Sequence, residues 1–232
     1  VAAATAFRNP KIDFVWNSTL EEIKGRDEVE GLVIKNVVTG ASSEVETDGI
    51  FFFVGMIPQT ELVRDLVECD DKGYIAVNEK KETSVPGIYA IGDVTGGIQL
   101  AHAATAQGRN AVAAMAGKEP SIDLSVIPGC VYTDPEIGCA GITADEAKAA
   151  GLEIISRKYV MGANGKSVLS GQERGFIKIV AASDTHRILG AQMMCARATD
   201  MISQFSAAIV NGLTLEDLAR VVFPHPTFSE AI

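Results

Sequence analysis

Gly87-Ile88-Tyr89-Ala90-Ile91-Gly92-Asp93-Val94 is the stretch on which the interpretation of this chain rests. Its apolar residues Ile88–Ile91 predict a short strand, and a Gly-Asp pair stands directly at the end of that strand. A helix is predicted over Leu100–Met115, with Gly117 as its C′ residue. A carboxylate at this place can accept hydrogen bonds from sugar-like hydroxyls, and the amino end of the helix offers unpaired N–H groups and a positive dipole. The same residues also fit a plain turn in which Asp93 only caps the chain, so both interpretations stay open.

Short apolar runs separated by turns make up the chain before this stretch. The predicted elements are strands at Ile12–Trp16, Val29–Val38, Ser43–Thr47, Gly49–Gly55 and Tyr74–Val77 and a helix at Gln59–Val67. The run Gly49–Gly55 is almost continuously apolar, which is typical of a strand buried on both faces of a sheet. The pattern indicates an α/β portion over residues 1–118.

The chain after Lys118 has an α+β pattern. The predicted strands are Gly129–Thr133, Ile154–Val160, Gly175–Ala181 and Ile188–Met194, and the predicted helices are Thr143–Ala150, Ala198–Asn211 and Thr214–Arg220. Thr143 and Glu146 form a capping-box pattern at the first of these helices, and Asp217 takes the same position in the last. The polar segment Lys118–Ser125 contains a proline and is typical of a linker. We therefore expect a second domain, with an antiparallel sheet and packed helices, over residues 119–232.

Pro224-His225-Pro226-Thr227-Phe228-Ser229-Glu230 is the second stretch that could carry chemistry. If His225 lies in the turn before a helix, the carboxylate of Glu230 can reach its imidazole, fix its tautomer and raise its basicity. Thr227 and Glu230 also form a T-x-x-E capping box, which needs no catalytic role. The two interpretations are compatible, because a helix that is capped in this way can also orient the histidine.

The stretch at residues 87–94 resembles the second flavin-binding signature of the pyridine-nucleotide–disulfide oxidoreductases, "Tyr-Ala-x-Gly-Asp". By that resemblance, Asp93 binds the ribityl chain of FAD, and the helix that begins at Leu100 approaches the pyrimidine side of the flavin. The residues assigned to the cofactor are Gly92, Asp93, Leu100, Ala101, His102 and Ala103. Gly55–Thr60 resembles the "Gly-x-x-Pro-Asn-Thr" that closes the NAD(P) domain, although Gln59 replaces the Asn. Residues 12–93 look more like thioredoxin reductase than like dihydrolipoamide dehydrogenase.

The C-terminal stretch resembles the "His-Pro-Thr-x-x-Glu" motif of dihydrolipoamide dehydrogenase, glutathione reductase and their relatives. The resemblance makes His225 the acid/base for the dithiol and Glu230 the residue that orients it, and it favours the lipoamide branch. Tyr132–Gly138, Ala163–Lys166 and Ile188–Ala191 are similar to segments of the family's dimerisation domain. The resemblance thus implies an α+β interface (dimerisation) domain over residues 119–232, preceded by an incomplete α/β FAD/NAD(P)-binding portion over residues 1–118.

The family resemblance implies a homodimer that oxidises dihydrolipoamide with NAD, through FAD and a redox disulfide. The chain carries no G-x-G-x-x-G and no Cys-x-x-x-x-Cys, which in this family build the FAD site and the redox centre. We therefore expect that the chain as given binds neither cofactor stably and is inactive alone. Two alternatives stay open: a glutathione- or thioredoxin-reductase-like disulfide reductase, and a non-catalytic dimerisation fragment.

Composition excludes several other classes of function. The net charge of −10 argues against binding to nucleic acid, and no apolar run reaches the roughly 18 residues of a membrane helix. The 4 cysteines and 3 histidines are scattered and predict no metal site, and reduced cysteines are expected in a cytoplasmic protein. His186 is predicted to be a solvated residue at a hairpin tip. Because Val1 is not an initiator methionine, we expect the chain to begin inside a longer protein, with a start after a processing or cloning junction as the alternative.

Overall fold

The computed structural model describes residues 7, 9–52 and 55–232. The chain divides into two compact units, residues 1–56 and residues 57–232, and each is described by itself. The predicted boundary between residues 118 and 119 lies inside the second unit and stays a prediction.

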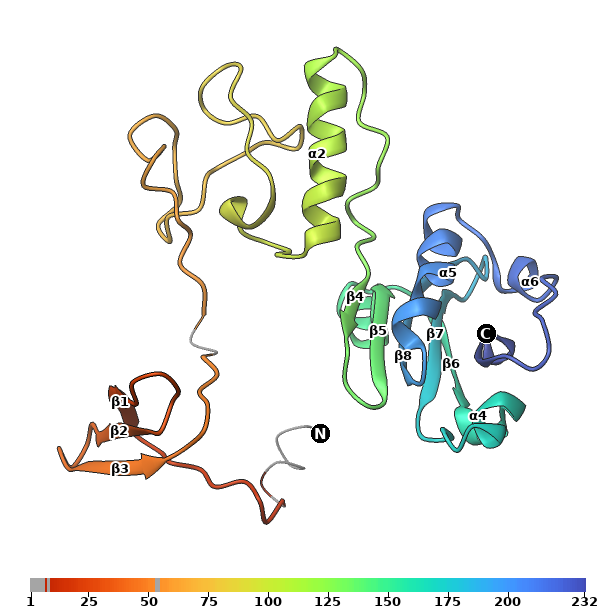
Figure 1. Cartoon of the computed structure of the whole chain (residues 1–232). Coiled ribbons are helices and arrows are strands. Elements are labelled where there is room, and N and C mark those ends of the chain that lie inside the picture. Colours follow the sequence, from red (N-terminus) through yellow and green to blue (C-terminus); the bar gives the residue numbers. More distant parts are fainter. Residues whose placement is uncertain (1–6, 8, 53–54) are drawn as a thin grey trace. The chain divides into compact units, whose positions relative to one another are not determined.

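The first unit is an antiparallel sheet of strands β1 (Ser18–Lys24), β2 (Gly31–Asn36) and β3 (Ser42–Glu46), in that order (Figure 1). The second and third strands lie where the sequence predicts strands. The first was not predicted, because its register shifts between Leu20 and Glu22 and the shift breaks the alternation that marks a strand. The strand predicted at Ile12–Trp16 is wrong.

Ring contacts replace that predicted strand. The ring centroids of Phe14 and Trp16 lie 5.6 Å apart, and those of Phe7 and Phe14 lie 4.6 Å apart. The rings of Phe14 and Trp16 are stacked, and the ring of Phe7 is tilted against that of Phe14. The segment is therefore held by its side chains and not by a strand ladder.

The prediction that Gly49–Gly55 is a strand buried on both faces is also wrong for its described residues. Phe51 is 87% exposed and Phe52 is 59% exposed, and neither lies in a strand. Phe53 and Val54 lie outside the described residues. A strand that is buried on both faces needs paired neighbours and a cover on each side. In the described part of the first unit, the only sheet is β1–β3, and none of its strands pairs with this run.

Residues 57–100 form mostly turns and short bridges around a small core of Val67, Ile75 and Ala90. The helix predicted at Gln59–Val67 is wrong: the segment is a series of turns, in which Val67 joins this core while Leu62 remains 95% exposed. The strands predicted at Tyr74–Val77 and Ile88–Ile91 contribute only single bridges, between Cys69 and Ile75 and between Glu82 and Tyr89.

Helix α2 (Ala101–Met115) confirms the prediction for the end of this portion. Gly117 follows it with a φ of +68°, the left-handed conformation that favours glycine after a helix. The buried side chain of Gln107 accepts a hydrogen bond of 2.8 Å from the N–H of Gly92, which joins the helix to the 3-10 helix η1 (Gly92–Thr95). Asn110 is hydrogen-bonded through its side chain to both the N–H and the carbonyl of Ile122.

The second half of the chain is an antiparallel sheet of order β4-β5-β8-β7-β6 (Figure 1). The strands are β4 (Gly129–Val131), β5 (Glu136–Gly141), β6 (Ile154–Val160), β7 (Phe176–Ala182) and β8 (Ile188–Cys195). The helices are α3 (Ala144–Ala149), α4 (Gly165–Leu169), α5 (Ala198–Val210) and α6 (Leu215–Leu218), with 3-10 helices η2 (Met161–Ala163) and η3 (Phe228–Ala231). This confirms the α+β fold class, and capping boxes are present at Thr143, Thr214 and Thr227.

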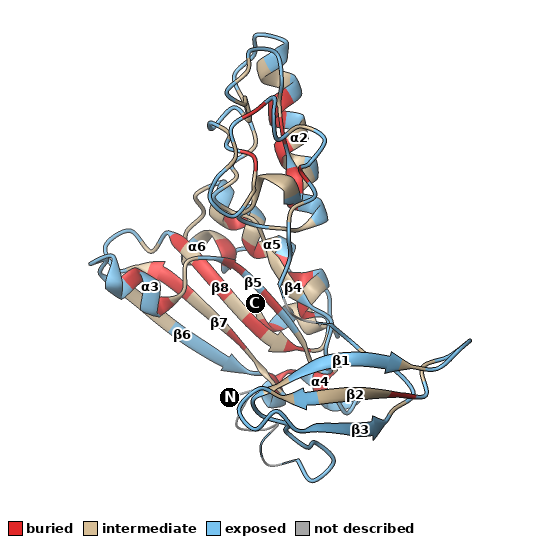
Figure 2. Ribbon diagram, turned by 90° about the vertical axis from the view of Figure 1, so that its left-hand side faces the viewer, coloured by how far each residue is buried: buried red, intermediate tan, exposed pale blue. Residues whose placement is uncertain are grey.

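The core of this half lies where α5 packs on the sheet. Figure 2 shows the buried residues along α5, β7 and β8, and Phe205, Ile177 and Met193 are at most 1% exposed. Gly138 allows the helix to come close: a Cβ there would lie 2.8 Å from the carbonyl oxygen of Ala198. The sheet therefore has its own cover, and the C-terminal residues, including η3, pack against the same core.

Candidate functional site

The segment that carries His225 is anchored by the 3-10 helix that follows it. Ala231 is 6% exposed and belongs to the core, and Phe228 and Ile232 pack against that core. The Thr227 hydroxyl donates a hydrogen bond of 2.7 Å to the carbonyl of Pro224, which closes the turn around the histidine. His225 thus stands on a turn that is fixed on both sides.

The structure brings His225 and Glu230 together. Nδ1 of His225 lies 2.9 Å from Oε1 of Glu230, while the other carboxylate oxygen accepts a hydrogen bond of 2.8 Å from the N–H of Thr227. The Thr227 N–H, followed by the His225 imidazole, holds the pKa of the Glu230 carboxyl below its ordinary value. At neutral pH the carboxylate is therefore ionised and can only accept, so Nδ1 of the neutral ring must be the donor.

The remaining ring nitrogen is the group that can react. The His225 side chain is 78% exposed, whereas the Glu230 side chain is 28% exposed. With the proton held on Nδ1, Nε2 has a lone pair that can accept a proton from a molecule that approaches from outside. The pair therefore has the arrangement of a general base whose tautomer is fixed by a carboxylate.

The residues that the sequence assigns to a cofactor lie around η1 and the start of α2. Gly92 is buried and has a φ of +73°, where a side chain would be strained, and Asp93 is exposed. Leu100 provides no side-chain cap, so the first N–H groups of the helix are not satisfied by that residue. Ala101 is exposed and Ala103 is 1% exposed, so the latter can offer only its backbone.

His102 has a contact of its own. Its Nε2 lies 2.7 Å from the carbonyl oxygen of Pro128, in the segment that leads to β4. A ring nitrogen that donates to a backbone carbonyl is oriented by the protein. The side chain of His102 therefore contacts the chain itself, in contrast to the exposed carboxylate of Asp93.

These residues fit a part of FAD. A carboxylate at the end of the glycine turn suits the hydroxyls of a ribityl chain, and uncapped N–H groups at a helix start suit the electron-rich edge of a flavin. In the described residues, no set of three His, Cys, Asp or Glu side chains comes together to hold a metal ion.

Sequence reasoning gave no role to one buried side chain beside the histidine turn. Asn164 is 3% exposed, and its Nδ2 donates a hydrogen bond of 3.1 Å to the carbonyl of Thr227. The resemblance of Ala163–Lys166 to a loop of the dimerisation domain assigns no role to this side chain. Because the two residues are 63 positions apart, no local pattern could have revealed the contact.

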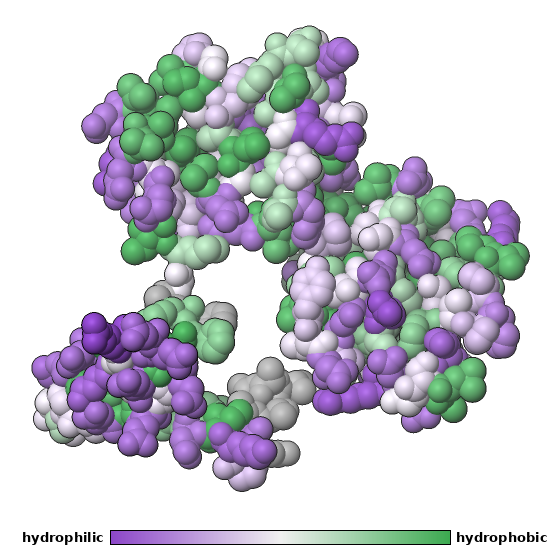
Figure 3. Space-filling view, viewed as in Figure 1, coloured by the Kyte–Doolittle hydropathy of each residue, from purple (hydrophilic) through white to green (hydrophobic). Residues whose placement is uncertain are grey.

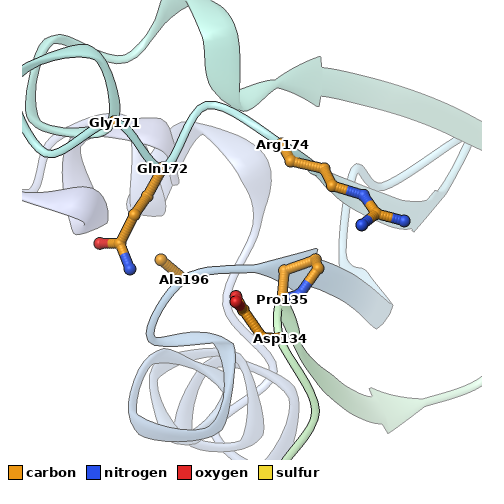
Figure 4. Close-up of a pocket in the computed structure, with 6 residues that line it drawn as sticks. All are labelled: Asp134, Pro135, Gly171, Gln172, Arg174 and Ala196. Atoms are coloured by element: carbon orange, nitrogen blue, oxygen red, sulfur yellow. The ribbon is translucent and has the colours of Figure 1, made fainter.

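A separate pocket lies on the same half of the chain. Figure 4 shows it lined by Asp134, Pro135, Gly171, Gln172, Arg174 and Ala196. None of the six was predicted to act in catalysis or to bind a cofactor. The pocket brings an acidic and a basic side chain to one surface, and we assign it no role.

Comparison with known proteins identifies one family along the chain. Residues 1–108 match the pyridine nucleotide-disulphide oxidoreductases, and residues 127–232 match the dimerisation domain of the same family. A dihydrolipoyl dehydrogenase of Bacillus subtilis strain 168 is 36% identical over 204 residues, which are 87% of this chain and 43% of that protein. That of Geobacillus stearothermophilus is 35% identical over 211 residues, 89% of this chain and 45% of that protein.

Solved structures show the same fold. LpdA from Mycobacterium tuberculosis superposes with a TM-score of 0.84 at 24% identity, over 99% of this chain and 50% of that one. The HOCl-induced flavoprotein disulfide reductase RclA from Escherichia coli superposes with a TM-score of 0.79 at 23% identity, over 98% of this chain and 52% of that one.

The chain spans less than half of the length of the two relatives named above. In the described part of the chain, no helix is long and apolar enough to cross a membrane. Two successive parts of one family match in order along the sequence, so the chain belongs to the pyridine nucleotide-disulphide oxidoreductases and resembles their dihydrolipoyl dehydrogenases.

Proposed function

We propose that this chain is the C-terminal part of a dihydrolipoamide dehydrogenase, in which His225 is the acid/base and Glu230 orients it. The observation that supports this most directly is the hydrogen bond of 2.9 Å between His225 Nδ1 and Glu230 Oε1, on an imidazole that is 78% exposed. A second support is the name that the curated relatives share. Their activity belongs to proteins about twice as long, so for this chain it is a proposal.

The pair of His225 and Glu230 is suited to take a proton from a dithiol. Oxidation of a dithiol forms one S–S bond, breaks two S–H bonds, and releases two protons and two electrons. A thiolate is the reactive form of a thiol, so a base that takes one of these protons accelerates the step. Nε2 of His225 is placed to take that proton, and the carboxylate of Glu230 would stabilise the imidazolium that results. FAD, when it is bound by the whole protein, supplies the electron transfer between disulfide and NAD.

Toward that flavin we assign the residues of the glycine turn and the helix start. Asp93 would accept hydrogen bonds from the ribityl hydroxyls, with Gly92 leaving room for the turn. The N–H groups of Ala101, His102 and Ala103, after Leu100, would face the pyrimidine edge. The supporting observations are the exposed Asp93 and the missing side-chain cap at Leu100.

A homodimer through residues 119–232 is part of the proposal. The match to a dimerisation domain supports it, and so do apolar side chains that this half leaves exposed. Val222 is 93% exposed, Tyr132 81% and Leu169 75%, and Figure 3 shows hydrophobic side chains on the surface of this half. Burying such side chains against a second copy would stabilise the dimer. We place the protein in the cytoplasm, where its cysteines stay reduced.

For the chain as given, we propose dimerisation without turnover. The sequence has no G-x-G-x-x-G to hold the pyrophosphate of a dinucleotide and no Cys-x-x-x-x-Cys to exchange electrons with a substrate. Purified 232-residue protein should therefore be a colourless dimer in light scattering. A yellow preparation with stoichiometric flavin would contradict this part of the proposal.

The activity itself is tested on the full-length protein to which this sequence belongs. Turnover is measured with lipoamide, glutathione and thioredoxin, each with NAD(H) and with NADP(H). We expect lipoamide with NAD(H) to be the fastest combination. If glutathione or thioredoxin is preferred, the corresponding reductase replaces the leading proposal.

The catalytic pair has a matched control within the chain. Changing His225→Gln in the full-length protein should lower lipoamide turnover by about 10²–10⁴-fold with unchanged flavin content, because a general base is lost. His186 makes the same kind of contact, with 2.5 Å between its Nδ1 and Oε1 of Glu216, but on the hairpin beside α6. His186→Gln should leave turnover unchanged. Equal losses in the two variants would contradict the role of His225.

A further inference from the structure

We propose that Asn164 is a positioning residue for the acid/base turn: its buried carboxamide holds the peptide between His225 and Glu230 in place. The proposal rests on the function proposed above. Asn164 lies at the start of α4, and only 3% of it is exposed. Its Nδ2 donates a hydrogen bond of 3.1 Å to the carbonyl oxygen of Thr227.

The orientation of this carboxamide is fixed from its other end. Oδ1 of Asn164 accepts a hydrogen bond of 2.9 Å from the N–H of Ser167 and one of 3.1 Å from the Ser167 hydroxyl. Because both partners on this side are donors, the amide oxygen must face them and the amino group must face Thr227. One side chain thus caps α4 and binds the histidine turn at the same time.

Thr227 transmits the contact to the catalytic pair. Its carbonyl accepts from Asn164, its N–H donates to Oε2 of Glu230 at 2.8 Å, and its hydroxyl donates to Pro224 at 2.7 Å. Every polar backbone and side-chain group of this residue therefore has a partner near the pair. A shift of Thr227 would move Glu230 relative to His225, so Asn164 would act on the pair through Thr227.

A helix cap alone would not require an asparagine here. An aspartate caps the start of a helix as well as an asparagine does. It cannot donate, however, and its second oxygen would face the Thr227 carbonyl, where two acceptors repel each other. Asn164→Asp therefore keeps the cap and removes the contact with the histidine turn, whereas Ser167→Ala removes a partner of the cap and keeps that contact.

The test uses the full-length enzyme and separates kcat from KM. Asn164→Asp should lower kcat for lipoamide by about tenfold, because small displacements of catalytic groups cost this much, with KM for lipoamide within a factor of about two. Ser167→Ala should keep the kcat of the wild type even if its melting temperature falls. If Asn164→Asp does not fold, Asn164→Ser replaces it, since a serine caps the helix but is too short to reach Thr227.

Two outcomes overturn the proposal, and they are distinguishable. If Asn164→Asp and Ser167→Ala both keep the wild-type kcat while His225→Gln is inactive, Asn164 has no positioning role and the proposed function survives. If His225→Gln itself keeps full turnover, the proposed function fails and the positioning role falls with it. Dye reduction by the nicotinamide, which needs no dithiol base, should stay unchanged in every variant and serves as the control for an intact flavin site.

Discussion

The C-terminal half of this chain buries its large apolar side chains, whereas the first unit leaves large apolar side chains exposed. In residues 129–232, Phe205 of helix α5 and the strand residues Ile177 and Met193 are at most 1% exposed, in the core between α5 and the sheet. In the described part of the first unit, Trp16 is 63% exposed and Phe51 is 87% exposed, and the three-stranded sheet has no helix beside it in that part. A sheet becomes stable when its apolar face is covered, and the described residues of the first unit do not provide a helix for that cover.

The proposed acid/base pair and the proposed flavin residues stand on cores of different size. The proposed acid/base pair stands on the half that has a core of its own, and the turn of His225 is fastened to that core through η3. The proposed flavin residues stand on a portion whose core is Val67, Ile75 and Ala90. The proton-transfer geometry can therefore be complete in this chain, whereas the flavin contacts need further support.

The largest difference is expected when residues 119–232 and residues 1–118 are expressed as separate fragments. Residues 119–232, expressed alone, should give one cooperative thermal transition, because they contain the whole core around Phe205. Residues 1–118 alone should melt without a cooperative transition, since their buried clusters are small. Circular dichroism during heating measures both. A sharp transition in the fragment of residues 1–118 would contradict this expectation, because it would require a larger core than the cluster of Val67, Ile75 and Ala90.

One substitution in each part of the chain compares a buried aromatic side chain with an exposed one. Phe205→Ala should lower the free energy of unfolding of the C-terminal half by about 3–5 kcal/mol, because it empties a fully buried aromatic site. Phe51→Ala should change stability by less than about 0.5 kcal/mol, since its side chain is already 87% exposed. Urea unfolding of the whole chain measures both values. A large loss with Phe51→Ala would mean that this ring is covered in solution.

The sequence predicted the C-terminal half better than the first part of the chain. Strand β6 has the predicted ends, Ile154–Val160, and the capping boxes at Thr143 and Thr214 mark helix starts, because those signals are local. The motif of His225 and Glu230 was also local, five residues apart, and the structure brings the two side chains together. In most of the C-terminal half, local pattern and global packing agree, although strand β5 and helix α4 were not predicted.

Two errors in the first part and one omission in the C-terminal half have causes that a local sequence pattern does not show. The run Gly49–Gly55 has the composition of a buried strand, but a strand also needs neighbours, and composition cannot supply them. The bulge after Leu20 hid β1, because it shifts the alternation by one residue. The contact of Asn164 with Thr227 was missed for a related reason: the partners meet only when α4 packs beside η3.

A smaller loss of stability than that of Phe205→Ala is expected at the junction of β5 and α5, where Glu136 accepts hydrogen bonds from the hydroxyl and the N–H of Thr199 at 2.6 and 3.0 Å. The Thr199 hydroxyl, followed by the Thr199 N–H, holds the pKa of the Glu136 carboxyl below its ordinary value. A carboxyl whose pKa is lower in the folded state stabilises the fold above its unfolded pKa of about 4.3, and this stabilisation is lost as the pH falls through the lowered value. Glu136→Gln should therefore cost about 1 kcal/mol at pH 7.

That cost should shrink as the pH falls below about 4, because a protonated carboxyl and an amide then present similar groups to Thr199. Urea unfolding of the wild type and of Glu136→Gln between pH 7 and pH 3.5 measures the difference, and Thr199→Val serves as the matched variant that removes the hydroxyl instead. If the cost of Glu136→Gln stays constant over this range, the negative charge is not what joins the strand to the helix. The stability of the C-terminal half would then come from apolar packing. Its difference from the first unit would be one of core size and not of hydrogen bonds to a carboxylate.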